Sequence, residues 1–124
     1  MPMFAAGSLA ACTLTMLCAG GPAPTPESSL TLTLETANGA ARAVHLVCEP
    51  PMGTHPHPGG ACAAIESAGG DLERLPADNQ PCPMIYAPVQ ARAHGHWKGE
   101  PVDFHTEYSN ECFADGESGG VFGF

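Results

Sequence analysis

The sequence predicts an α+β fold with about five antiparallel strands and one or two short helices. Two observations lead to this prediction. The chain of 124 residues contains 13 Pro and 15 Gly but only 14% charged residues, which favours short strands and many turns over long helices. Several segments also alternate apolar and polar residues, the period of a strand with one buried face. At this length we expect a single core of modest size.

The first two strands are expected to form a hairpin. Residues 30–34 alternate apolar and polar side chains over five positions. Asn38 and Gly39 follow, and this pair is a strong signal for a two-residue turn. Residues 44–48 are then predicted to be the returning strand.

A short helix is expected after this hairpin. Residues 49–58 contain four prolines, so they cannot be helical. Residues 60–68 place apolar side chains at helical spacing and are followed by two glycines, which favour a helix end there. Residues 71–75 are expected to add one more turn, with Asp71 as its cap.

The second half of the chain is expected to complete the sheet. Residues 89–94 alternate again, and we predict a turn around Gly95 after them. The longest strand should follow this turn. Its expected inner face is formed by Val102, Phe104, Thr106 and Tyr108.

The C-terminal part is expected to end in a strand. Residues 110–112 begin a short irregular or helical piece, and residues 115–120 are predicted to form a turn. Residues 121–124 should then close the chain as the last strand.

The charge of the protein excludes two classes of partner. The net charge is −9 and the chain contains only four Lys or Arg residues. Nucleic acids and anionic membrane surfaces both require a basic footprint, so neither is an expected partner. The sequence indicates no cofactor.

The N-terminal segment resembles a signal peptide. Residues 1–26 are apolar and small and end in a Pro-rich lead-in, which leaves residues 27–124 as the folded domain of an exported protein. A basic start is missing, because no Lys or Arg precedes Arg42. The residues before Cys12 also resemble a lipoprotein processing box, so a lipid anchor at Cys12 is a minor alternative to free secretion.

Six cysteines divide between this segment and the domain. Cys12 and Cys18 lie near the start, and no role is predicted for Cys18. The domain contains Cys48, Cys62, Cys82 and Cys112, which allow three pairings. A structural zinc site is a poor fit because no CxxC pair is present. We therefore expect two disulfides formed in an oxidising compartment.

The segment Pro81-Cys82-Pro83-Met84-Ile85-Tyr86-Ala87-Pro88 combines stiffness with an apolar tip. Each proline fixes its own φ, and Pro83 forces Cys82 into an extended conformation. If Cys82 forms a disulfide, Met84 and Ile85 are held out in water, where something is expected to bind them. The alternative is an edge strand in which Met84 and Tyr86 pack inward.

Two motifs suggest chemistry that the sequence does not support. Gly116-Glu117-Ser118-Gly119-Gly120 resembles the surroundings of a nucleophilic serine, but a domain this small cannot supply the required base and oxyanion donors, so we predict a hairpin turn and no enzyme. His94 and His96, like His55 and His57, could share a metal ion. No further ligands are evident, so we predict solvent-facing histidines and no metal.

Trp97 is expected in the core or on a dimer surface.

A series of short blocks identifies a family resemblance. The blocks are Cys48-Glu49-Pro50, Gly53-Thr54-His55-Pro56, Gly60-Ala61-Cys62, Gly69-Gly70-Asp71-Leu72, Cys82-Pro83-Met84-Ile85-Tyr86, Pro88-Val89, Ser109-Asn110-Glu111-Cys112 and Val121-Phe122-Gly123-Phe124. In this order and spacing they resemble the Streptomyces subtilisin inhibitor family. The similarity extends from about Leu30 to the last residue.

The resemblance implies a fold and a function. It implies a five-stranded antiparallel sheet with two short helices, the disulfides Cys48–Cys62 and Cys82–Cys112, and a homodimer formed through the sheet. The implied function is that of a secreted inhibitor of subtilisin-like serine proteases. It acts by substrate-like binding of a reactive loop with the scissile bond Met84–Ile85. The resemblance also implies that neighbouring loop residues contact the protease, namely Pro81, Cys82, Pro83 and Tyr86. The alternative is a secreted, disulfide-stabilised binding module without inhibitory activity.

Overall fold

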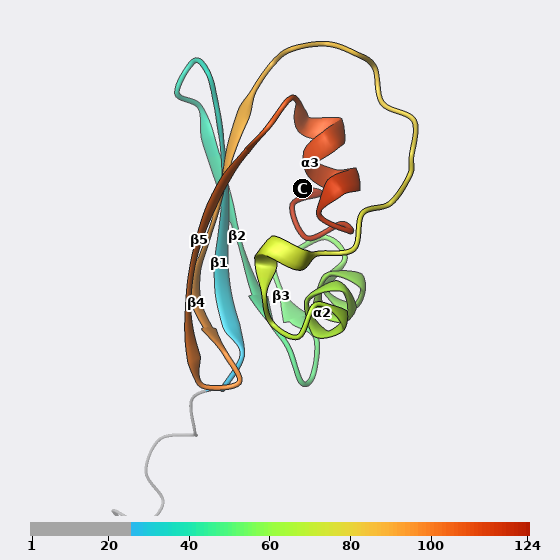
Figure 1. Ribbon diagram of the computed structural model, residues 1–124. Coiled ribbons are helices and arrows are strands. Elements are labelled where there is room, and N and C mark those ends of the chain that lie inside the picture. The colour runs from blue at the N-terminus through green and yellow to red at the C-terminus, as the bar shows by residue number, and fades with distance from the viewer. Residues whose placement is uncertain (1–25) are drawn as a thin grey trace, which may run out of the picture.

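One five-stranded antiparallel sheet forms the body of the protein (Figure 1). The structure, a computed structural model, describes residues 26–124. The strand order across the sheet is β3-β2-β1-β4-β5. In chain order the strands are β1 (Ser29–Thr36), β2 (Ala41–Val47), β3 (Met52–Gly53), β4 (Val89–Trp97) and β5 (Glu100–Tyr108).

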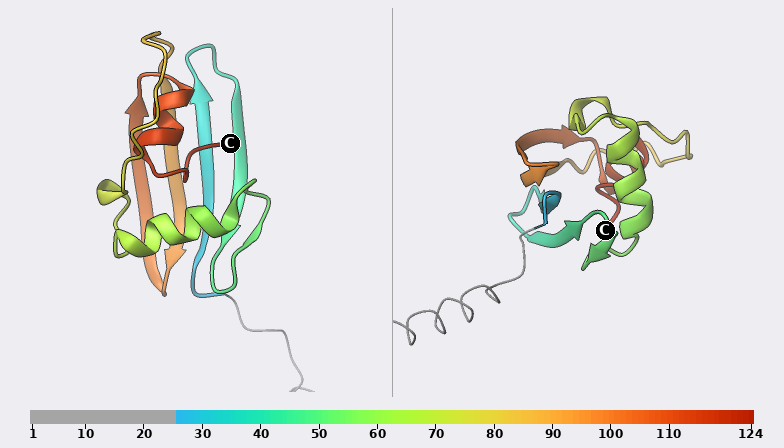
Figure 2. Two further views of the ribbon diagram at one scale, coloured as in Figure 1. Left: turned by 90° about the vertical axis from the view of Figure 1, so that its right-hand side faces the viewer. Right: turned by 90° about the horizontal axis from the view of Figure 1, so that it is seen from below.

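The helices of the described region lie on one side of this sheet. They are α2 (Pro58–Ser67), the single 3-10 turn η1 (Leu72–Arg74) and α3 (Glu111–Glu117). Figure 2 shows α2 crossing the strands near one end of the sheet and α3 lying near the other end. Within residues 26–124, no element covers the opposite face of the sheet. The predicted α+β class is confirmed.

The core lies between the helices and the inner face of the sheet. Leu30, Leu32 and Leu34 of β1 are at most 2% exposed, as expected from their alternation. Val89, Ala91 and Ala93 of β4 lie beside them and are equally buried. Ile65 of α2 and Phe122 of the C-terminal segment cover this surface from the other side. The alternating pattern therefore identified the buried face of β1 and β4 correctly.

The C-terminal segment is not the predicted strand. Residues 121–124 form a turn and an irregular end that pack on the inner face of the sheet. The Phe122 ring is 6.1 Å from that of Phe104 and 6.2 Å from that of Tyr108. Its backbone N–H donates to the Ser118 hydroxyl at 2.9 Å. The apolar residues that indicated a strand instead fill the core. Residues 121–124 are called the C-terminal plug.

The fifth strand is a short one in the Pro-rich segment. Met52 and Gly53 of β3 pair with Val47 and Leu46 of β2. Residues 49–58 were predicted only to be non-helical, and the strand of two residues is too short to give an alternating pattern. The prediction of five strands is correct in number, but one strand was misplaced.

Strand β4 continues through Gly95, where a turn was predicted. The chain reverses instead at Lys98 and Gly99, whose φ angles of 49° and 84° suit a tight hairpin turn. Gly95 has a φ of 148°, and a Cβ there would collide with the backbone oxygen of Ser29 in β1. This glycine therefore permits close approach of two paired strands rather than a turn.

The remaining helical predictions are mostly correct. Helix α2 begins at Pro58, two residues before the predicted start, because proline is tolerated in the first helical turn. Asp71 caps η1 as expected, since its carboxylate accepts from the Glu73 N–H at 2.9 Å. Residues 115–117, predicted as a turn, belong to α3.

We predict that Gly95→Ala destabilises the protein by roughly 2 to 4 kcal/mol, because the added methyl group meets β1 and the φ angle is unfavourable for alanine. Urea unfolding followed by circular dichroism measures this change. Gly59→Ala in α2 is the matched control, since nothing lies within 4 Å of its added Cβ. An unchanged midpoint for Gly95→Ala would contradict the close strand approach.

Tyr108 predicts a loss of stability at alkaline pH. Burial, helped by the nearby Glu117 carboxylate, raises the pKa of Tyr108 from its ordinary value of 10 to about 12. The folded state thus favours the neutral phenol, so the stabilisation is complete below pH 10 and is lost as the pH rises toward 12. We expect the free energy of unfolding to fall by about 2 kcal/mol over this range. Tyr108→Phe should remove that part of the pH dependence in urea titrations.

Candidate functional site

A long loop, residues 76–88, arches from η1 to the start of β4 (Figure 1). Its tip carries three large apolar side chains in succession. Met84 is 90% exposed, Tyr86 76% and Ile85 59%. A contiguous apolar surface of this kind usually marks a place where another molecule binds.

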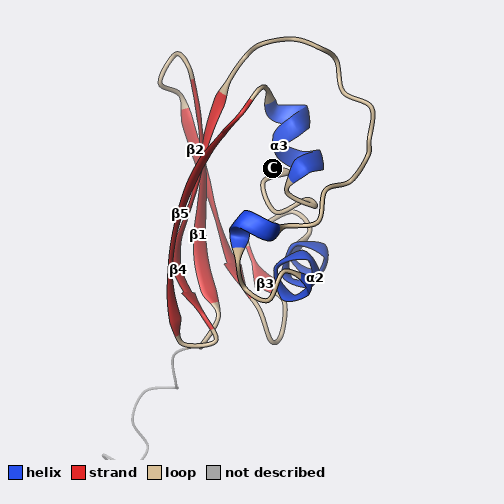
Figure 3. Cartoon of the chain, in the orientation of Figure 1, coloured by secondary structure: helices blue, strands red, loops and turns tan. Residues whose placement is uncertain are grey.

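The tip does not belong to the sheet. Residues 81–88, all within the described region, have no strand assignment and are drawn as loop in Figure 3. The Ala87 N–H donates to the Ser109 oxygen at 2.8 Å, just before β4 begins. The alternative of an edge strand with Met84 and Tyr86 packed inward is therefore wrong.

A groove separates the loop tip from the β1–β2 turn. Its volume is about 520 Å³. Ile85 and Pro88 form part of one wall, and Ala37 and Asn38 of the turn form part of the other. Asn110 and Cys112 line the same groove.

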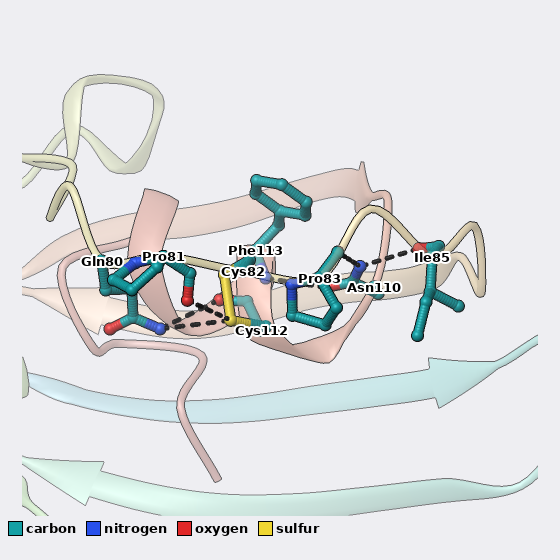
Figure 4. The surroundings of a disulfide bond; sticks show 8 residues. All are labelled: Gln80, Pro81, Cys82, Pro83, Ile85, Asn110, Cys112 and Phe113. Carbon is teal, nitrogen blue, oxygen red and sulfur yellow. Dashed lines mark hydrogen bonds between the residues drawn. A yellow bond between two sulfur atoms is a disulfide. The ribbon is translucent and has the colours of Figure 1, made fainter.

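A disulfide anchors the loop to α3. Cys82 is bonded to Cys112 in the first turn of the helix, and their Cα atoms are 5.7 Å apart (Figure 4). Gln80 adds a hydrogen bond from its side-chain amide to the Cys112 oxygen at 3.3 Å. The disulfide closes a span of 30 residues. In the chain-entropy model such a bond stabilises a fold by roughly 3 to 4 kcal/mol.

The second disulfide stabilises the other end of the core. It joins Cys48, just after β2, to Cys62 in α2. Both cysteines are buried. The structure thus contains both disulfide pairs that the family resemblance implies.

Asn110 holds the backbone on both sides of Met84. Its side-chain N–H groups donate to the Pro83 oxygen at 3.1 Å and to the Ile85 oxygen at 2.7 Å (Figure 4). Its side-chain oxygen accepts from the Phe113 N–H at 3.0 Å, which caps α3. Asn110 is only 6% exposed, so the donor side of these bonds is shielded from competing water.

Sequence reasoning assigned no role to Asn110. Its position at the start of a helical piece is a signal for an N-cap, because asparagine is preferred there. A capping asparagine uses its oxygen for the helix and retains two N–H donors for other partners. That the partners are loop carbonyls depends on the folded arrangement.

Ser118 has a structural role at the end of α3. It is fully buried, and its hydroxyl donates to the Ala114 oxygen at 2.6 Å and accepts from the Phe122 N–H at 2.9 Å. The hydroxyl proton is thereby engaged within the helix. The predicted hairpin turn at this motif is incorrect, because the motif ends a helix and the described residues after it contain no strand.

The histidine pairs differ from each other. His94 and His96 are exposed on β4, as predicted. His55 is only 3% exposed, so the prediction of a solvent-facing side chain is wrong for it. Its Nε2 lies 2.9 Å from the Val121 oxygen, and its Nδ1 lies 2.9 Å from the His57 N–H. His55 therefore links the Pro-rich segment to the C-terminal plug.

Within residues 26–124, no group of three or more His, Cys, Asp or Glu residues is arranged to hold a metal ion. Trp97 is buried in the core at 6% exposure. None of the helices in the described part of the chain is long and apolar enough to cross a membrane. The signal-like segment and the interpretations of Cys12 and Cys18 concern residues outside the described range.

Comparison with known proteins identifies the family. Residues 26–110 match the sequence model of the family described as subtilisin inhibitor-like. The chain belongs to the subtilisin inhibitor-like family. The predicted membership of the Streptomyces subtilisin inhibitor family is thus confirmed.

Relatives of this family come from Streptomyces. A putative serine protease inhibitor of Streptomyces avermitilis is 44% identical over 102 residues, covering 79% of this chain and 68% of the relative. The subtilisin inhibitor of Streptomyces albogriseolus is 40% identical over 118 residues, covering 87% and 82%. These subtilisin inhibitor-like relatives are similar over most of the described domain.

A solved structure has the same fold. Streptomyces caespitosus sermetstatin, in a crystal structure of its complex with Bacillus licheniformis subtilisin, superposes with a TM-score of 0.62 at 30% sequence identity. The match covers 78% of this chain and 98% of sermetstatin. The subtilisin inhibitor-like fold predicted from sequence is therefore correct.

We predict that Asn110→Asp loosens the loop while preserving the helix cap. A carboxylate still accepts from the Phe113 N–H, but it cannot donate to the Pro83 and Ile85 oxygens. The NMR order parameters of the Met84 and Ile85 amides should fall below about 0.6.

Asn110→Ala is the matched comparison, because it removes the cap as well. It should loosen the loop similarly and cost about 1 kcal/mol more in global stability. Unchanged order parameters in both variants would show that the disulfide alone fixes the loop.

Proposed function

We propose that this protein inhibits subtilisin-like serine proteases by presenting the Met84–Ile85 bond as a substrate. The observation that carries the proposal is the exposed apolar tip of residues 84–86, whose backbone is held by Asn110 and by the Cys82–Cys112 disulfide. The relative named as a subtilisin inhibitor and the solved complex of sermetstatin with subtilisin support this class of partner.

Docking places Met84 in the primary pocket of the protease. A serine protease binds an extended segment and polarises the scissile carbonyl in its oxyanion hole. The uncharged, flexible Met84 suits a broad apolar pocket. Pro81, Cys82 and Pro83 precede it and Tyr86 follows, and these residues contact the enzyme on either side. Since Asn110 and the Cys82–Cys112 disulfide already restrain the loop backbone, little conformational entropy is lost on binding.

Turnover is slow because both sides of the bond stay in place. Cleavage requires the new amine of Ile85 to leave the active site. The Pro83 oxygen before the bond and the Ile85 oxygen after it are bonded to the same Asn110 amide. The disulfide at Cys82 restrains the acyl side further. The amine therefore remains close to the acyl group, and resealing of the bond competes with hydrolysis.

The protein is proposed to act without catalysis of its own. The one serine in a nucleophile-like motif, Ser118, is fully buried and bonded within α3. An exported binding module that uses the same apolar tip without inhibiting is the alternative function. Titration of a protease distinguishes the two.

The inhibitor is further proposed to be secreted and dimeric. Residues 1–26 would be the signal-like leader, with a lipid anchor at Cys12 as a minor variant, and residues 27–124 the inhibitory domain. The sheet face that carries His94 would form the dimer interface. The intact mass of the exported protein tests the first proposal, and retention of the leader would contradict it. Sedimentation equilibrium tests the second, and a monomer at micromolar concentration would contradict it.

We predict stoichiometric inhibition of subtilisin that depends on position 84. Residual activity should fall linearly with added protein to an endpoint of one inhibitory domain per protease. Met84→Gly and Met84→Asp should weaken inhibition by at least tenfold, because the first leaves the pocket empty and the second buries an unpaired charge.

Met84→Lys is the matched control for specificity. It should weaken subtilisin inhibition and strengthen the expected weak inhibition of trypsin, whose pocket prefers a cationic side chain. If Met84→Gly inhibits subtilisin as well as the parent protein, the assignment of the reactive bond fails.

A further inference from the structure

The sulfur atoms of the described domain differ sharply in access to solvent. Within residues 26–124, Cys48, Cys62, Cys82 and Cys112 are all consumed in disulfides. The two methionines of this range are Met52, which is 53% exposed on β3, and Met84, which is 90% exposed. Oxidation of thioethers follows their exposure. The most accessible oxidisable sulfur of the domain is thus at the tip of the loop.

We propose that Met84 is an oxidation site whose conversion to the sulfoxide reversibly switches off protease binding. The inference rests on the proposed function and concerns its regulation. The oxidant is a hydroperoxide. The Met84 sulfur attacks the terminal peroxide oxygen, an S–O bond forms as the O–O bond breaks, and the sulfur loses two electrons. The remaining oxygen takes up the proton and leaves as water or an alcohol.

Oxidation leaves the loop and the fold intact. The bonds that hold the tip start from the Asn110 side chain and end on backbone oxygens of Pro83 and Ile85. The disulfide anchor is at Cys82. The Met84 side chain takes part in neither restraint and lies outside the core. A sulfoxide at this position therefore changes the chemistry of the tip and not its shape.

Oxidation of Met84 should weaken binding because the Met84 side chain must lose its hydration when it binds the protease. The proposed docking transfers the Met84 side chain from water into an apolar pocket. A thioether makes this transfer readily, whereas the sulfoxide oxygen is a strong acceptor that loses its hydrogen bonds to water. We expect the affinity for subtilisin to fall by roughly tenfold to a hundredfold.

The exposed position also makes the change reversible. Methionine sulfoxide reductases return the sulfoxide to the thioether, with one enzyme for each epimer. A dithiol supplies the two electrons and two protons, becomes a disulfide, and the sulfoxide oxygen leaves as water. Because Met84 is 90% exposed on the loop that arches over the domain (Figure 1), such an enzyme can reach it without unfolding the domain. The inhibitor would thus respond to peroxide in its surroundings and recover when reducing activity returns.

Peroxide titration of the full chain tests this inference. The protein is treated with hydrogen peroxide, the peroxide is removed with catalase, and peptide mass mapping locates the sulfoxides before subtilisin inhibition is measured. Met84 should be oxidised before Met52, and inhibition should weaken by at least tenfold. Treatment with both reductases and a dithiol as their reductant should restore it.

Two variants separate Met84 from the other methionines. Met84→Leu has no thioether at this position, so whatever inhibition it shows before treatment should be unchanged after peroxide, measured against its own untreated value. Met52→Leu should lose inhibition on treatment as the parent chain does.

Three results would overturn the inference: undiminished inhibition after complete oxidation of Met84, equal loss in Met84→Leu, or no recovery with reductase. If the untreated chain fails to inhibit subtilisin, the proposed function itself is wrong and this inference falls with it.

Discussion

The attachment of the loop to the first turn of α3 is the constraint on which the candidate site depends. Asn110 and Cys112 are two residues apart in sequence, and each holds a different part of the loop. Asn110 donates hydrogen bonds to backbone oxygens on both sides of Met84, and Cys112 forms the disulfide with Cys82 just before the tip. Because both belong to one helical turn, the loop cannot shift relative to α3 without breaking them. The position of α3 therefore determines the position of the tip.

Helix α3 is in turn fixed by contacts at both of its ends. At its start, Arg42 of β2 forms an ion pair with Glu111 and also donates to the Phe124 oxygen. At its end, Ser118 closes the last turn and binds the Phe122 N–H, and Phe122 packs on Phe104 and Tyr108 of β5. The contacts of the C-terminal plug thus connect α3, and through α3 the loop, to the sheet. Residues 121–124, which were predicted to form a strand, therefore hold α3 in place by packing in the core.

The sequence predicted most of the fold because its largest signals are local. Alternation in β1 and β4 identified the buried leucines and alanines, and glycines after residue 68 identified the end of α2. The failures have physical reasons. Residues 121–124 have strand-like composition, but burial against the sheet takes precedence over pairing. Gly95 signals a turn by its residue type, yet its role is set by a strand that lies 66 positions earlier at Ser29. Asn110 was missed because its loop partners are distant in the chain. At the loop, three prolines and a cysteine within eight residues left both an exposed tip and an edge strand open, and the family resemblance favoured the exposed tip.

The Met84 side chain takes no part in holding the loop in place. Every restraint on it acts through backbone oxygens, a neighbouring cysteine or the prolines, while the Met84 side chain extends away from the body. The backbone and the disulfide thus hold the loop in place, whereas the Met84 side chain is free to contact a partner. For an inhibitor of the proposed kind, this separation has an evolutionary consequence. Position 84 can vary without a folding penalty, so a duplicated gene can follow a change in the pocket of its target by single substitutions.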